Sequence, residues 1–330
     1  MRTSRTFSSL LILLAALFLV TQVGLAADPG ATYSPDNAAS DQKAGSVLFF
    51  NIYTSDATSP TTQNTKFSIT NTSPSEAVAV HLFFVDGVSC SPADFIVCLT
   101  ASQTISYDTA DLDPNTEGYI VAVAVDGNGM PKKHNYLIGQ EFVKFASGHQ
   151  AGLGAIAVAS NWVQQLDETA VMADLIFDRD MYEQLPAVLA IDNIPSRVSN
   201  NDTMVIINRP SGDLALGANS IGSIFGLLYN DTETAYSFNL SSSRCQYRFF
   251  FNNPTPRTAP RFTTVVPDGR TGWVKFYSVS GAPLIGAMIN YNSSSSGVPT
   301  AYTGGHNLHQ LRLTNATLRI PIYPAACFDR

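Results

Sequence analysis

The sequence predicts an all-β protein in which two antiparallel β-sandwiches follow one another along the chain. Three observations carry the prediction. Apolar side chains recur with the period of two that a strand requires, turn residues separate these segments, and the order of the segments occurs twice. Short strands separated by turns are typical of antiparallel sandwiches and not of folds that alternate strands with helices.

The first copy begins with the apolar and aromatic run SVLFFNIY at residues 46–53. In the later run EAVAVHLFFVDG, Asp86-Gly87 marks a turn. Two sets of four apolar side chains each share one strand face: Val78, Val80, Leu82 and Phe84, then Tyr119, Val121, Val123 and Val125. These segments predict strands joined by tight turns.

The second half of the chain repeats the order of the first at an offset of about 153 to 159 residues. The segment at 203–213 stands where 46–56 stood, and Gly272-Trp273 corresponds to Gly118-Tyr119. Each copy has the length of one sandwich domain, so the repeat predicts two tandem domains. The alternative is a chance similarity between two stretches of generic β sequence.

The chain divides into five expected parts. These are a signal peptide at 1–26, a disordered leader at 27–43, a sandwich at 44–160, a connecting segment at 161–184 and a second sandwich at 185–330. Apolar residues in the connecting segment approximate helical spacing and predict a possible short helix there. The connection is not rich in Gly or Ser, so we expect the two domains to be packed together.

The N-terminus has the order of a secretory signal peptide. Arg2 and Arg5 precede the apolar run 10–20, and the small residues Ala26 and Ala27 follow as a cleavage site. An uncleaved anchor is the alternative, although the run is short for a spanning helix. We therefore expect a secreted protein, placed in the periplasm, at the cell surface or outside the cell, with no stable membrane span after cleavage.

The charge balance bears on the partners. Loss of residues 1–26 leaves 17 Lys and Arg against 26 Asp and Glu, a net charge of −9. Binding to phosphates needs clustered cations, so this composition argues against a nucleic acid partner. The expected partner is an extracellular protein or a glycan.

Four cysteines remain in the exported part, at Cys90, Cys98, Cys245 and Cys327. An oxidising compartment favours disulfides, and four cysteines allow three connectivities. The spacing favours Cys90–Cys98 with Cys245–Cys327. A zinc site is the alternative, but the cysteines form no C-x-x-C pair and have no nearby histidine.

Catalytic and metal motifs match only in part. GANSIG at 217–222 is one residue out of register with the nucleophile motif of α/β-hydrolases. His306 and His309 are three apart with no acid between them, unlike the zinc peptidase motif. DLDPNTEG at 111–118 lacks the glycine and final glutamate of a calcium loop. No catalytic residue, cofactor or metal ligand is therefore expected, although paired carboxylates on distant strands would leave no such motif.

Two glycine-histidine pairs stand in similar surroundings. KFASGHQAGLG contains Gly148-His149, and YTGGHNLHQL contains Gly305-His306. A catalytic base would rarely recur without its partners, whereas a structural device would recur with a repeated fold. We expect these four residues to lock two equivalent loops, through a glycine with an unusual backbone angle and an imidazole bonded to a loop carbonyl. A functional site is the alternative.

Function is predicted from architecture and from the signal sequence. The tandem sandwiches resemble immunoglobulin-like domains in architecture only, because the Cys, Trp, Cys spacing of true immunoglobulin domains is absent. We expect a secreted, non-enzymatic structural or adhesive protein of the cell surface or extracellular space. The alternatives are a pair of carbohydrate-binding modules, which would expose aromatic rings, and an exported hydrolase with a site between the domains.

Overall fold

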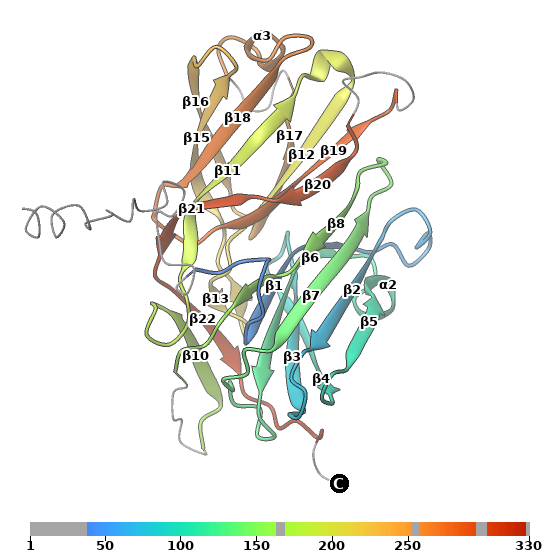
Figure 1. Ribbon diagram of the computed structural model, residues 1–330, viewed down its shortest axis with the longest axis vertical. Coiled ribbons are helices and arrows are strands. Elements are labelled where there is room, and N and C mark those ends of the chain that lie inside the picture. Colours follow the sequence, from blue (N-terminus) through green and yellow to red (C-terminus); the bar gives the residue numbers. More distant parts are fainter. Residues whose placement is uncertain (1–37, 163–168, 253–257, 295–301, 328–330) are drawn as a thin grey trace, which may run out of the picture. The chain divides into compact units, whose positions relative to one another are not determined.

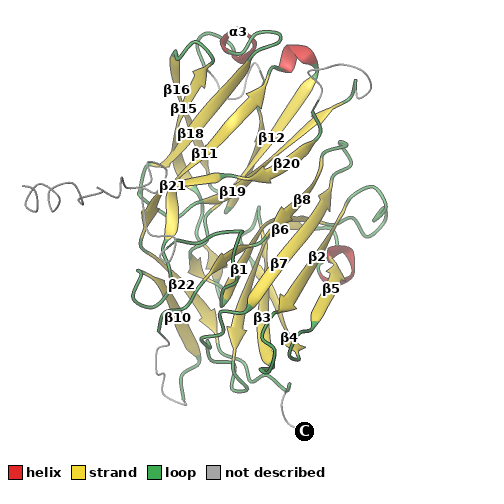
Figure 2. Ribbon diagram, viewed as in Figure 1, coloured by secondary structure: helices red, strands yellow, loops and turns green. Residues whose placement is uncertain are grey.

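A computed structural model describes residues 38–162, 169–252, 258–294 and 302–327. It is 56% strand and 4% helix, and its sheets are antiparallel apart from the short pairing of β13 with β22 (Figures 1 and 2). The prediction of an all-β, antiparallel protein is therefore confirmed. The described residues form one compact unit, and the expected signal peptide at 1–26 lies outside them.

Nine strands of the first half form two sheets. Sheet 1 has the order β4 (Pro92–Leu99), β3 (Val78–Asp86), β6 (Glu117–Val125), β1 (Val47–Thr54) and β9 (Ile156–Val158). Sheet 2 has the order β5 (Thr104–Asp108), β2 (Asn64–Asn71), β7 (Leu137–Lys144) and β8 (Gln150–Gly154).

Nine strands of the second half form two more sheets. Sheet 3 has the order β16 (Ala235–Ser242), β15 (Gly222–Asn230), β18 (Thr271–Ser278), β11 (Leu185–Pro195) and β21 (His309–Thr314). Sheet 4 has the order β17 (Gln246–Phe250), β12 (Asn201–Asn208), β19 (Ile285–Asn292) and β20 (Gly304–Asn307).

A fifth sheet departs from the expected pair of immunoglobulin-like sandwiches. Sheet 5 joins β10 (Met172–Phe177), β22 (Ala316–Pro321), β13 (Gly212–Asp213) and β14 (Gly217–Ala218). Its strands come from the connecting segment, the second half and the C-terminal region. The arrangement is therefore a five-sheet fold, and the simple tandem prediction is corrected in this respect.

The strands of sheet 1 are apolar on both faces, so each face of the sheet must pack against another sheet. All eight residues of β1 are buried, so its side chains are apolar or enclosed on both sides. One face packs on sheet 2 through a core that includes Phe50 and Phe67. The other packs on sheet 5 through a core that includes Phe49 and Phe177. Sheets 3 and 4 enclose a separate core that contains Ile191.

The few helical turns are short. They are α2 (Thr109–Leu112), η2 (Arg197–Ser199) and α3 (Phe262–Val265). Within the described ranges, none of the helices has the length and apolar character needed to cross a membrane. The helix expected in the connecting segment falls largely on residues 163–168, outside the described residues, and the described part of that segment contributes the strand β10.

The end of the predicted leader is ordered, contrary to expectation. Ala38 and Ala39 are buried, and the backbone of Ser40 exchanges hydrogen bonds of 2.9 and 2.8 Å with Ala157 in β9. Ser40 thereby extends the edge of sheet 1 beyond β9, and Ala39 packs in the core shared by sheets 1 and 5. The rest of the leader lies outside the described residues.

Candidate functional site

Sheets 2 and 4 meet in an apolar cluster that joins the two halves of the chain. Its members are buried side chains from both halves: Ile52, Val143, Phe145, Leu153, Met204, Ile206, Ala287 and Ile289. We call this cluster, with the polar contacts beside it, the joint. Closely packed apolar side chains resist relative movement, so the cluster ties the halves together.

Buried amide side chains add directional contacts to the joint. The Asn208 amide donates to the Asn51 carbonyl at 2.7 Å. The Gln246 amide donates to the Gly118 carbonyl and to the Asn208 side chain, both at 2.8 Å. The Asn51 amide donates to Asn307 Oδ1 at 2.8 Å. Buried amides that lose such partners destabilise a fold, so these bonds fix one arrangement of the halves.

A β-bulge explains how Asn51 reaches across. The pairing of β1 with β6 shifts register between Phe50 and Tyr53, which frees the backbone of the two residues between them from the ladder. The freed Ile52 N–H points at the carboxyl group of Glu141, at 3.4 Å from Oε2. The bulge thus directs the Asn51 carbonyl and the Ile52 N–H toward the joint.

Glu141 is a fully buried carboxyl group in this region. Burial raises its pKa well above the ordinary range, and the backbone N–H groups of Ile52 and Asn51 only partly oppose that shift. Its second oxygen, Oε1, has no hydrogen-bond partner. Burial in this setting therefore favours the neutral form of the carboxyl group.

His149 lies in the turn between β7 and β8 and is buried. Its Nε2 is 2.8 Å from the backbone carbonyl of Asp202, and its Nδ1 is 2.9 Å from Ser147 Oγ. Since a carbonyl only accepts, Nε2 carries the proton and Nδ1 accepts from the serine hydroxyl. Burial lowers the pKa of this histidine. The ring therefore bonds a carbonyl of the other half and not one of its own loop.

Gly148 has the backbone angle that glycine allows. Its φ is +91°, and a Cβ there would come within 2.7 Å of the Tyr291 ring. The second pair differs, because Gly305 and His306 lie inside β20 and Gly305 has no positive φ. The two pairs thus occupy different places, which corrects the expectation that they are equivalent loop locks.

His306 and His309 approach Asp192, a residue that no sequence motif links to them. Each Nε2 atom lies 3.6 Å from Oδ1 of Asp192 in β11. No local motif joins these residues, because the aspartate comes from a strand more than a hundred residues earlier in the chain. Pairing of β11 with β21, which sets Ala190 opposite His309, brings them together.

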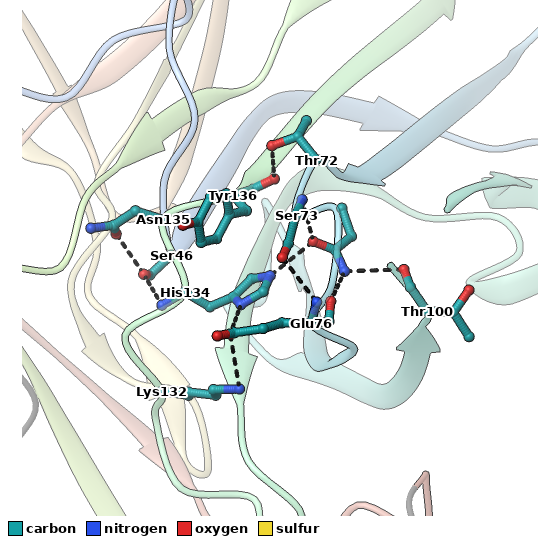
Figure 3. Close-up of polar contacts among 10 residues, drawn as sticks. Ser46, Thr72, Ser73, Glu76, Thr100, Lys132, His134, Asn135 and Tyr136 are labelled. Carbon is teal, nitrogen blue, oxygen red and sulfur yellow. Dashed lines mark hydrogen bonds and ion pairs between the residues drawn. The ribbon is translucent and has the colours of Figure 1, made fainter. Parts of the chain in front are cut away.

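A second buried histidine fastens the turn between β2 and β3. His134 Nε2 donates to Asn71 Oδ1 at 2.9 Å, and its Nδ1 lies 3.5 Å from Glu76 Oε2 (Figure 3). The Asn71 amide in turn donates to the carbonyls of Glu76 and Thr100, at 2.7 and 3.0 Å. The Asn71 side chain uses all these contacts within the protein, so the network stabilises the fold.

The cysteines pair differently from the favoured connectivity. Cys98 and Cys327 form a disulfide that fastens the C-terminal segment to β4. Cys90 and Cys245 are free, buried thiols that lie beside each other. The pKa of Cys245 is raised, mainly by burial and further by the neighbouring Cys90. The predicted pairs Cys90–Cys98 and Cys245–Cys327 are therefore wrong, because strand packing and not sequence spacing decides which cysteines meet.

A hollow of about 770 Å³ opens beside the joint. Its lining combines the half-exposed ring of Phe142 with the charged side chains of Lys144 and Asp108. Thr303 and Gly304 of the second half close one side. An apolar ring flanked by both charges suits contact with a polar ligand or partner, but by itself performs no chemistry.

Comparisons with known proteins provide no family. No family model matches the chain, and no curated protein matches it. Among solved structures, an α-L-rhamnosidase from Streptomyces avermitilis has 11% identity and a TM-score of 0.19 over 86% of this chain, which spans 26% of that enzyme. The major pilin of Streptococcus pyogenes has 10% identity and a TM-score of 0.21, over 84% of this chain and 99% of the pilin. Scores this low carry no argument about fold or function.

Proposed function

We propose that the chain is an exported, non-enzymatic structural or adhesive protein of the cell surface or extracellular space. The joint is the observation that carries the proposal. Apolar side chains of both halves pack together, and buried amides bond across them. Such a joint holds two β units as one stiff body, which suits a protein that transmits or resists force.

The strand order supports the finer proposal of a duplicated, immunoglobulin-like sandwich unit. Taken in chain order, the nine strands of sheets 1 and 2 correspond one for one to those of sheets 3 and 4. A register shift also falls at matching places, between Phe50 and Tyr53 in β1 and between Ile191 and Ile194 in β11. This correspondence pairs β1 with β11, and not with residues 203–213. Sheet 5 is an addition to the duplicated unit.

The cysteine chemistry supports export. Cys98 and Cys327 form a disulfide. Disulfides persist in oxidising compartments and are rare in the cytosol. This disulfide fits the basic start, apolar run and small residues at positions 1–27. The disulfide favours an oxidising compartment, and the N-terminal pattern favours a mature protein that begins near Asp28.

The carbohydrate-binding alternative receives less support. It requires two or three exposed rings in one plane, so that a sugar can lie across them. Tyr229 and Trp273 instead stack on each other, with centroids 4.3 Å apart and ring planes at 10°. Rings that cover one another across neighbouring strands stabilise the sheet and leave fewer faces for a sugar.

The proposal is tested in intact producing cells. An antibody against the described region should bind the cell surface or the medium fraction, and the mature N-terminus should map near Asp28. Deleting the gene should weaken attachment or envelope integrity. The full chain should restore it, whereas a control chain lacking residues 2–26 should not. A chain retained in the cytoplasm with its first 26 residues attached would contradict the proposal.

A further inference from the structure

Two histidines, His306 half-buried and His309 exposed, are held side by side where the chain passes from sheet 4 to sheet 3. His306 lies in β20 and His309 begins β21. Leu308 between them is buried in the core of sheets 3 and 4, and its N–H donates to the Gly286 carbonyl at 2.9 Å. This anchor keeps both imidazoles outside the core, with ring centroids 5.7 Å apart.

A β-bulge brings a carboxylate to the same place. The pairing of β11 with β18 shifts register between Ile191 and Ile194, so Asp192 belongs to the irregular stretch. Bulges re-aim side chains and are frequent beside sites. The ligand atoms of Asp192, His306 and His309 all lie within 4.8 Å of one another.

The distances suit a shared ion better than direct bonds. Asp192 Oδ1 lies 3.6 Å from Nε2 of each histidine, which is longer than a hydrogen bond of about 2.7–3.2 Å. In a tetrahedral zinc site, bonds of about 2.0–2.1 Å separate neighbouring ligand atoms by roughly 3.3 Å. The two separations from Asp192 Oδ1 are within a few tenths of an ångström of that value, and the two histidine ligand atoms lie no more than 4.8 Å apart.

The tautomer of His306 is already that of a ligand. Its Nδ1 lies 2.8 Å from the Asn307 carbonyl, which only accepts, so Nδ1 carries the hydrogen and Nε2 presents its lone pair. A carbonyl that fixes an imidazole in this way is the usual second contact of a metal-bound histidine. Asn307 is itself held, because its amide donates to the Gly154 carbonyl at 2.7 Å.

We propose that Asp192, His306 and His309 bind one divalent transition-metal ion, with Zn²⁺ as the representative. Two imidazoles and one carboxylate favour Zn²⁺, Cu²⁺ or Ni²⁺ over Ca²⁺ or Mg²⁺, which prefer oxygen ligands. The three side chains are between 41% and 63% exposed, so the remaining coordination positions face solvent. The site goes beyond the proposed function. The histidine spacing alone does not predict it, because the carboxylate comes from another strand.

The test uses the exported chain without a histidine tag, stripped with a chelator and titrated with Zn²⁺ by calorimetry. His309→Ala removes a ligand, and Asp192→Asn removes the charge. Asp180→Asn serves as a matched control, because Asp180 is also an exposed aspartate. Loading with one equivalent of Cu²⁺ gives an independent reading, since electron paramagnetic resonance resolves coupling to ligand nitrogens.

The expected result is one bound Zn²⁺ per chain, with affinity lowered at least ~10-fold by His309→Ala and by Asp192→Asn and unchanged by Asp180→Asn. The Cu²⁺ spectrum should show coupling to two nitrogens in the wild type and to one in His309→Ala. Absence of binding, or binding that survives both ligand substitutions, would overturn the proposal. Export and attachment are measured separately, so failure of the metal site leaves the proposed function standing.

Discussion

Replacing Glu141 by glutamine should remove a pH-dependent loss of stability. Glu141 is fully buried in β7, and its carboxyl oxygens receive only backbone N–H groups of the bulge in β1. It forms no ion pair with any residue in the described ranges. Burial without a cation favours the neutral acid, which is why the pKa is raised.

The sign follows from the protons that each state binds. Below the unfolded pKa of about 4.3, the carboxyl group is protonated in both states and costs nothing. Above it, the unfolded chain releases the proton while the folded chain keeps it, until the pH reaches the raised folded pKa. Across that window the free energy of unfolding falls by about 1.4 kcal/mol per pH unit. Glutamine does not titrate, so Glu141→Gln should lack this contribution.

The assay is urea unfolding followed by circular dichroism at pH 5, 6 and 7. The quantity compared is the change in unfolding free energy between pH values, because the new amide also alters absolute stability. At pH values below the raised folded pKa, wild type should lose about 1.4 kcal/mol per pH unit relative to Glu141→Gln. Glu233→Gln, at an exposed glutamate, should follow wild type. Parallel curves for wild type and Glu141→Gln from pH 5 to pH 7 would refute the reasoning.

Three further predictions concern the disulfide, the glycosylation sequons and the hydrogen bond of His149. Cys98→Ser opens the link to Cys327 and should lower the free energy of unfolding by about 2–5 kcal/mol, because the disulfide closes a long loop; an unchanged midpoint in denaturant would contradict it. In a glycosylating secretory host, mass spectrometry should find glycan at the exposed sequon of Asn239 and none at Asn71, whose amide is buried and bonded. His149→Ala leaves the Asp202 carbonyl unpaired and should cost about 1–3 kcal/mol, measured by thermal unfolding, whereas a change below 0.5 kcal/mol would argue against that contact.

The sequence predicts the strands well because their signal is local. Alternation of apolar side chains follows from the pleat, so Tyr119 and Val121 fall on one face of β6 and both enter the same core. The turn at Asp86-Gly87 likewise ends β3. Such signals need only neighbouring residues, and for this reason the sequence predicts the all-β, antiparallel character of the fold.

Pairings between distant segments were not predictable in the same way. Sheet 5 depends on β10 meeting β22, and Cys98 meets Cys327 because the chain beyond β22 returns to β4. Nothing in the spacing of either pair carries that information. Asp192 joins the two histidines for the same reason, since only the pairing of β11 with β21 places it there.

Differential scanning calorimetry of the chain without residues 1–26 tests the central claim, that the joint makes the two halves one unit. A rigid joint predicts a single transition whose calorimetric and van't Hoff enthalpies agree, since neither half unfolds without the other. Replacing Met204 and Ile206 in the joint by serine should split that transition. Two separate transitions in the wild-type chain would contradict the account.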